Sequence, residues 1–283
     1  MLTGSDARQL IQALKRQLIL SGAVRILLLA VIAVGVLATA WLARDDARLG
    51  LIWAAAALAG LTWIGLAVLS LRQMRAANQA TVYMANGRLD LAENQLISAA
   101  NQFSLYRQGK LLACHNLAVV AHGLRNFEAA ANLCDGVVAM KGRPTQLIGR
   151  TSRILLADCR LSLGDAAAAN RALAPLTQEI SRLSLDDQLL ILPIELRSKI
   201  AMNDFAGATS DLKEKVARAE LLDSPRAAMA HALMAVACLR TGDAEKAGFL
   251  LRRARLYHDL TELTEQAPGL RELLEPVTSA DNN

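Results

Sequence analysis

His115 and His122 are the two side chains of this sequence best suited to bind a metal ion. Neutral imidazole is a common zinc ligand, and two histidines on one helix can share a metal when they lie four residues apart. These two lie seven residues apart, which separates their backbones by ~10.5 Å on a helix. The spacing therefore predicts two partly buried histidines rather than one shared metal site.

The remaining reactive side chains show no spacing that is typical of catalysis. The four cysteines occur singly, at Cys114, Cys134, Cys159 and Cys238. Without a CxxC pair or Cys/His ligand spacing, we expect buried free thiols and neither a metal nor a cofactor. The sequence holds no GxxxxGK[ST] phosphate loop, and we expect Asp186 and Asp187 to begin a helix, whose N-terminus favours carboxylates. We therefore predict a protein that is not an enzyme.

The net charge of +5 comes from the first part of the chain. Residues 1–77 hold eight Lys or Arg and three Asp, whereas residues 78–283 hold 23 side chains of each sign. Arg150, Arg153 and Arg160 could follow one helix face, for anion or partner contact or simply as a solvated face. A nucleic-acid surface needs a concentrated basic face with stacking aromatics, and only 4% of residues are aromatic. We expect no nucleic-acid partner.

Two stretches without charge, residues 26–43 and 49–71, are long enough to cross a membrane. As helices they would span ~27 and ~34 Å, against a hydrocarbon core of ~30 Å. The basic residues flank this pair on its outer sides, so the positive-inside rule predicts that both termini and the later domain are cytoplasmic. We expect a multi-pass protein of the bacterial inner (cytoplasmic) membrane, which contacts lipid through this hairpin. A cleaved signal peptide ending near Ala40 is the alternative for the first stretch.

The segment before the first stretch is basic and amphipathic. Leu10, Ile11, Leu14 and Leu18 share helical spacing, so residues 5–20 form either a helix on the membrane surface or an extension of the first span, with Gly22 as a possible bend. No Pro, Gly or Ser cluster follows Leu71. We therefore expect the second span to continue as a helix into the next domain.

A six-residue motif recurs five times at intervals of 38 or 39 residues. It is GRLDLA from Gly87, RNFEAA from Arg125, GDAAAA from Gly164, NDFAGA from Asn203 and GDAEKA from Gly242. Gly or Asn opens four copies and suits the left-handed residue that ends a helix, and Asn or Asp follows in four copies and suits a helix cap. The final Ala permits close helix contact, and four residues later the second helix should bury Leu96, Cys134, Leu173, Leu212 and Leu251. This period predicts stacked helical hairpins.

These residues resemble the tetratricopeptide repeat (TPR) family, whose turn carries a G-D-[YF]-x-x-A pattern. The similarity covers residues 73 to about 260, although only Phe127 and Phe205 keep the aromatic and the period exceeds 34. The resemblance implies a solenoid that binds a peptide or helix on a concave face lined by first helices. Projected onto this sequence, that groove includes Met84, Leu112, His115, Val119, His122, Ile154, Asp158 and Arg197. The carboxylate clamp of some family members does not carry over, because only Asn116 matches it.

The sequence thus predicts an all-α protein with a two-helix transmembrane hairpin followed by a TPR-like α-solenoid of about five helical hairpins. The expected divisions are a basic N-terminal segment (1–23), the hairpin (24–72), the repeats (73–266), and a capping helix with a disordered tail (267–283). We expect a membrane-anchored scaffold or adaptor for protein partners. The alternative is a haem-linked role, because two N-terminal spans before TPR helices are similar in architecture to HemY-type proteins of haem biosynthesis.

Overall fold

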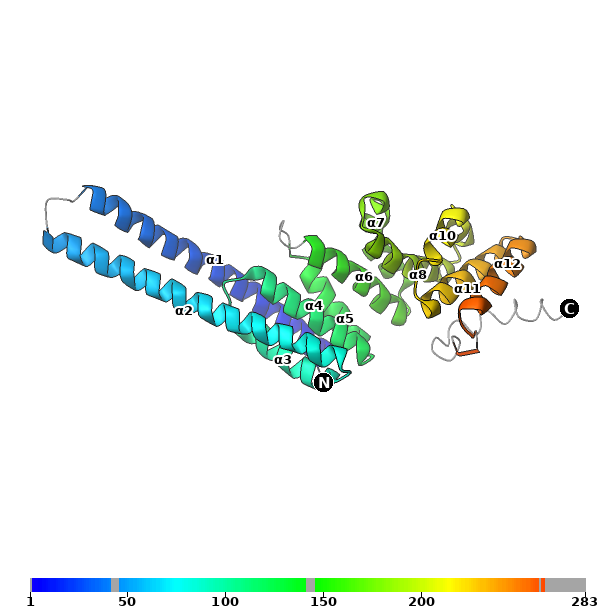
Figure 1. Ribbon diagram of the computed structural model, residues 1–283, viewed down its shortest axis with the longest axis horizontal. Helices are drawn as coiled ribbons and strands as arrows, with labels where there is room; N and C mark the ends of the chain where they lie inside the picture. Colours follow the sequence, from blue (N-terminus) through cyan, green and yellow to red (C-terminus); the bar gives the residue numbers. More distant parts are fainter. Residues whose placement is uncertain (1, 42–45, 141–145, 260, 263–283) are drawn as a thin grey trace. The chain divides into compact units, whose positions relative to one another are not determined.

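The structure, a computed structural model, describes residues 2–41, 46–140, 146–259 and 261–262 (Figure 1). All its regular structure is helical, and none of the described residues lies in a strand. The chain divides into two compact units, Met1–Ser152 and Arg153–Asn283. The predicted all-α class is confirmed for the described residues.

The first unit contains the two longest helices, α1 (Gly4–Trp41) and α2 (Asp46–Ala85). They run side by side and extend beyond the shorter helices α3 (Leu89–Asn101), α4 (Arg107–Gly123) and α5 (Phe127–Val138) (Figure 1). The second apolar stretch continues without interruption to Ala85, as predicted. Residues 5–20 belong to α1, which passes through Gly22 as one helix, so they extend the first apolar stretch.

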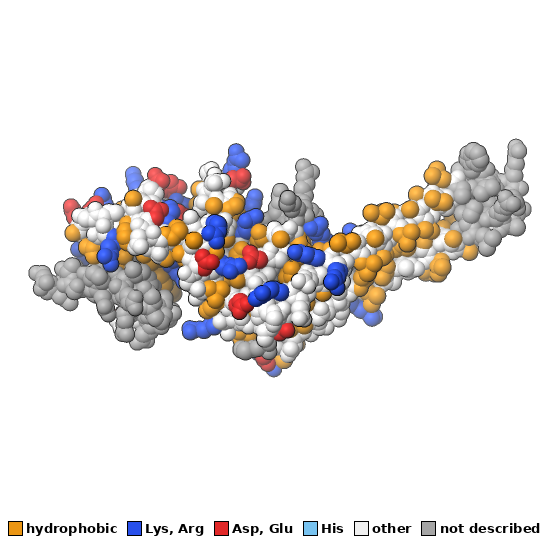
Figure 2. Space-filling model, turned by 180° about the vertical axis from the view of Figure 1, so that it is seen from behind, with side chains coloured by type: hydrophobic (Ala, Val, Ile, Leu, Met, Phe, Trp, Pro, Cys, Tyr) orange, Lys and Arg blue, Asp and Glu red, His pale blue; other side chains and the backbone are white. Residues whose placement is uncertain are grey.

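Both long helices are apolar enough to cross a membrane, over Gly4–Leu37 and Trp53–Ala85. Their large aliphatic side chains point outward; Ile26, for example, is 72% exposed and Leu61 67%. Figure 2 shows many apolar side chains on the described part of the two helices that extends beyond the shorter ones. A soluble core helix would bury such side chains, since each gains ~1.5–3 kcal/mol on leaving water.

The second unit is built around a buried helix, α11 (Ser224–Arg240). Every residue from Ala227 to Cys238 except Met229 is buried, and α11 packs against the helices on either side of it in sequence. The other elements are α7 (Ala166–Thr177), the 3₁₀ turn η2 (Ile180–Arg182), α8 (Leu185–Ala201), α9 (Phe205–Thr209), α10 (Leu212–Ala219) and α12 (Ala244–Tyr257). Helix α6 (Gln146–Ser162) begins in the first unit and ends in the second.

All five copies of the sequence motif form the same turn between two helices. The first residue of each has a left-handed backbone, with φ of 71° at Gly87, 60° at Arg125, 80° at Gly164, 58° at Asn203 and 85° at Gly242. In the first turn Gly87 N donates to Met84 O and Arg88 N to Tyr83 O, at 3.0 and 2.9 Å. The equivalent pair recurs in the other four, which is the Schellman arrangement that satisfies the last carbonyls of a helix.

The second motif residue caps the following helix wherever it is Asn or Asp. The side chains of Asn126, Asp165, Asp204 and Asp243 each accept a hydrogen bond from the backbone N–H three residues later. Arg88, at the same place in the first copy, makes no such bond. The sequence signature of the turn therefore predicts its caps copy by copy.

The motif alanines and most second-helix residues are buried as predicted. Ala92, Ala130, Ala169, Ala208 and Ala247 are all inaccessible or nearly so, and so are Leu96, Cys134, Leu173 and Leu251. Leu212 differs, because it is only half-buried. The fourth second helix is interrupted at Ser210 and Asp211, the latter with a φ of 50°, so the register changes between α9 and α10.

Some predictions lie outside what the structure determines. The last two residues of the first apolar stretch, residues 44 and 45 of the predicted turn at 44–48, and the predicted capping helix at 267–276 fall outside the described residues. The domain limits at 23, 72 and 266 and the stacking of all five hairpins into one solenoid stay predictions.

The left-handed backbone at Arg125 gives a test of the common turn. A left-handed conformation costs a residue with a Cβ about 1–2 kcal/mol, and Gly avoids that cost while losing about 0.5–1 kcal/mol of chain entropy. We expect Arg125→Gly to raise the melting temperature and Gly164→Ala to lower it. Arg125→Ala removes the same charge but keeps the strain, so an equal gain in that variant would contradict the explanation.

Candidate functional site

The predicted groove residues of the first unit lie on α2 and α4. Helix α1 packs mainly against α5 and α2, and α2 and α4 also contact each other. Met84 on α2 and the α4 residues His115, Val119 and His122 are half-buried, and Leu112 is 36% exposed. The structure therefore places five of the eight predicted side chains on neighbouring helices with part of each surface accessible.

The two histidines of α4 have separate surroundings. His115 Nδ1 lies 3.0 Å from Ser152 Oγ on α6, and burial lowers the pKa of its imidazole. The His122 ring meets Phe127 edge-on at 5.3 Å between centroids. No group of three or more His, Cys, Asp or Glu side chains arranged for a metal occurs among the described residues.

The remaining predicted groove residues belong to the second unit. Arg197 on α8 donates from Nη1 to Asp158 Oδ1 on α6 at 2.7 Å, so each residue has a charged partner within the fold. Ile154 is buried, at 6% exposure. Asp158 and Arg197 therefore connect α6 to α8, and Ile154 belongs to the core. Of the three, only Asp158 and Arg197 are half-buried and keep surface that a ligand could contact.

A cluster of buried polar contacts, which we call the junction, connects α1, α2 and α4 to the end of α3. The sequence alone does not predict it. Lys110 on α4 is 1% exposed, and its Nζ donates to Ala100 O at 3.1 Å and to Gln17 Oε1. Gln17 Nε2 donates to Asn101 O at 3.1 Å, and Gln73 Nε2 to Ala99 O at 2.6 Å. Side chains from α1, α2 and α4 thus satisfy the last carbonyls of α3, and a cation there is favoured by the helix dipole.

The first residues of the chain contact α3 and the start of α5. Leu2 N donates to Glu93 Oε1 at 2.6 Å, and Asn126 Nδ2 donates to Leu2 O. Arg8 on α1 forms an ion pair with Glu128 on α5 at 2.9 Å. These contacts place the beginning of α1 beside α3 and α5.

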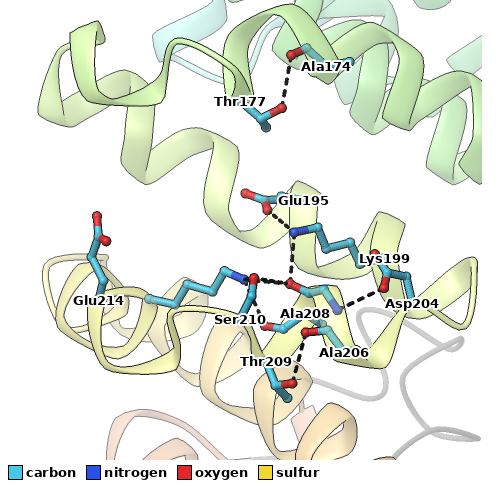
Figure 3. A network of polar contacts seen from close by, with 12 residues as sticks. Ala174, Thr177, Glu195, Lys199, Asp204, Ala206, Ala208, Thr209, Ser210 and Glu214 are labelled. Atoms are coloured by element: carbon cyan, nitrogen blue, oxygen red, sulfur yellow. Dashed lines mark hydrogen bonds and ion pairs between the residues drawn. The ribbon is translucent and has the colours of Figure 1, made fainter.

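Lysine side chains also complete the interrupted helix of the second unit (Figure 3). Lys215 is buried and its Nζ donates to Gly207 O at 2.9 Å and Ala208 O at 3.1 Å, at the end of α9. Lys199 also donates to Gly207 O, and it pairs with Glu195 at 2.6 Å. Burial, and then the neighbouring Lys199, lowers the pKa of Lys215. This network caps a helix end and offers no catalytic arrangement.

The cysteines are free and buried, as predicted. Burial raises the pKa of both Cys114 and Cys159 to about 12. Thiols are nucleophilic and ligate metals only as thiolates, so these side chains are inert in the folded protein.

No protein-family model, curated protein or solved structure matches this chain. Its class is therefore defined by the helices alone, as an all-helical protein with two helices apolar enough to cross a membrane. The resemblance to the TPR family stays a prediction.

Replacement of Lys110 tests the buried junction. Lys110→Met keeps most of the packing but leaves Gln17 Oε1 and Ala100 O without their donor, at a cost of ~1–3 kcal/mol for each buried group. We expect the melting temperature to fall by several degrees, measured in detergent with a thiol-reactive dye that detects the buried cysteines on unfolding. Lys213→Met, at an exposed position of α10, is the control. Equal melting temperatures for the two variants would show that the junction adds no stability.

We expect His231 on α11 to make the stability of the protein depend on pH. It is fully buried, stacks on Tyr257 at 5.6 Å, and has no hydrogen-bond partner for either ring nitrogen among the described residues. Burial, and then Arg253, lowers its pKa below the ordinary 6.5, so below that pH the unfolded chain binds the proton more readily. We expect the melting temperature to be unaffected by His231 protonation above pH 6.5 and to fall as the pH is lowered below 6.5. The His231→Phe variant should show a smaller fall. An unchanged pH profile in the variant would be evidence against this role.

Proposed function

We propose that this protein is a membrane-anchored scaffold whose helical hairpins hold a partner protein at the cytoplasmic face of a bacterial inner membrane. The partner would bind through a peptide or helix on the α2/α4 face of the first unit. The proposal depends above all on one observation, which is that apolar side chains on two contacting helices keep accessible surface: Leu112 on α4 is 36% exposed, and Met84 on α2 and Val119 on α4 are half-buried.

The outward-facing aliphatic side chains of α1 and α2 support the membrane anchor. Leu27, Leu61 and Ile64 are each more than half exposed within the first unit. Such contiguous apolar surface is stable against lipid, and helices satisfy their own backbone hydrogen bonds there.

The contacts at the two ends of the hairpin support its topology. Leu2 meets Glu93 near the start of α1, and Ser70 near the end of the α2 apolar stretch accepts a hydrogen bond from Leu105 N. Leu2 thus lies beside α3, and Ser70 lies beside the α3–α4 loop. The start of α1 and the end of the α2 apolar stretch must therefore be on the same side of any membrane. Two crossings satisfy this condition, whereas a cleaved first stretch would discard the part of α1 that packs on α5.

The α2/α4 face has the character expected for a helix or peptide partner. Leu112 and Val119 supply apolar surface, and His115 and His122 border it. Recognition of an amphipathic helix commonly uses such an apolar strip. Nothing among the described residues favours the haem-linked alternative, because both histidines contact other side chains of the protein.

Site-specific crosslinking in native membranes tests the proposed face. A benzophenone amino acid at position 112 of the full chain should form an adduct with one partner protein, identified by mass spectrometry. The same group at Leu256, an exposed leucine of α12, is the control. Leu112→Glu combined with Val119→Glu should reduce partner recovery at least tenfold. Adducts that form equally from both positions would contradict a specific site on α2 and α4.

A further inference from the structure

Basic side chains surround the apolar helices where these meet the first hairpin. We call Lys15, Arg16 and Arg25 of α1 and Arg72 and Arg75 of α2 the basic belt. Arg25 is half-buried and the others are exposed. Figure 2 shows Lys and Arg side chains where the apolar surface of the long helices ends.

No acidic residue of the neighbouring sequence balances this charge. Residues 7–44, 47–89 and 94–127 contain neither Asp nor Glu. These three ranges include the whole belt, the end of α3, the α3–α4 loop and α4. These parts of the first unit therefore hold an excess of positive charge, which attracts an anion from outside the protein.

The α3–α4 loop places the two ends of the belt beside each other. Leu105 N donates to Ser70 Oγ at 2.9 Å, two residues before Arg72. The guanidinium of Arg25 lies over the ring of the next residue, Tyr106, 5.9 Å from its centroid. Tyr106 itself is 42% exposed. The α3–α4 loop thus brings the exposed ring of Tyr106 to Arg25 of α1 and contacts α2 two residues before Arg72.

The surroundings of the belt select an anion with an apolar tail. Ile26 follows Arg25 directly and is 72% exposed, and Leu71 precedes Arg72 and is 50% exposed. A free phosphate would contact only the charges, whereas a phospholipid would also cover these aliphatic side chains. Arginine forks match phosphate oxygens, and Tyr favours the headgroup level of a bilayer.

We infer that the basic belt binds the headgroups of anionic phospholipids and so holds the first helical hairpin against the membrane surface. This inference rests on the proposed membrane function. It adds that anionic lipid is preferred at this surface, because each basic side chain near a membrane gains ~1 kcal/mol from anionic headgroups.

The test measures which lipids stay bound to the full-length protein. The protein is reconstituted in vesicles of phosphatidylcholine and phosphatidylglycerol at a 7:3 ratio, extracted in mild detergent, and its retained lipids are quantified by mass spectrometry. We expect phosphatidylglycerol to be enriched above the vesicle ratio, and Arg25→Gln, Arg72→Gln and Arg75→Gln together to abolish that enrichment. One basic side chain near the surface is worth about fivefold in binding.

Two control variants make the result specific. Arg252→Gln with Arg255→Gln, both exposed on α12, should keep the enrichment, and so should the triple Arg→Lys variant of the belt. Inorganic phosphate at 10 mM should not displace the retained lipid. Displacement by phosphate would show a simple anion site and overturn the lipid assignment.

The failures of the inference and of the proposed function are distinguishable. Protein that enters the vesicles but retains both lipids in the vesicle ratio overturns the basic belt as a lipid site and leaves the membrane anchor intact. Protein that does not enter vesicles of either composition contradicts the anchor and the inference together.

Discussion

The packing of the first turns of α1 against α5 is the contact on which the first unit depends. Leu10, Ile11 and Leu14 of this part of α1 are buried, and the tip of the Ile11 side chain lies 2.4 Å from the ideal position of a Cβ on Gly136 of α5. Only glycine allows this approach. Because the same helix continues into the exposed apolar stretch, α1 couples that stretch to the shorter helices of the first unit as one continuous element. The polar junction around Lys110 then aligns α2 with it.

Local features of the fold were predictable from the sequence because each depends on a few adjacent residues. The left-handed backbone, the paired carbonyl contacts and the helix caps at the five motifs follow from Gly, Asn and Asp at fixed positions. Arg125 lacks that signature and adopts the same backbone, since the flanking helices impose it. The interruption at Asp211 was not predictable, because it depends on buried Lys215 contacting carbonyls that no local pattern identifies.

The tertiary contacts of the candidate site lay beyond the sequence for a different reason. The amphipathic stripe of residues 5–20 was evident, yet a membrane surface and a protein surface would bury it equally well. Its partner, α5, lies more than a hundred residues later in the chain. Likewise, the projection of a groove identified partly accessible residues on α4, but it could not show that Asp158 and Arg197 pair with each other. The junction residues Gln17, Gln73 and Lys110 belong to no recognisable sequence motif.

Helix α1 is synthesised well before its packing partner α5. This separation in sequence affects the order in which the first unit folds during synthesis. The stripe of Leu10, Ile11 and Leu14 has no complete covering until residues 127–138 have been synthesised. At ~5–20 residues per second, that interval is about 6–25 s. During this time the two apolar helices are already long enough to leave the ribosome, while the start of the chain still exposes apolar side chains. In the membrane protein that we propose, insertion would therefore come before closure of the first unit.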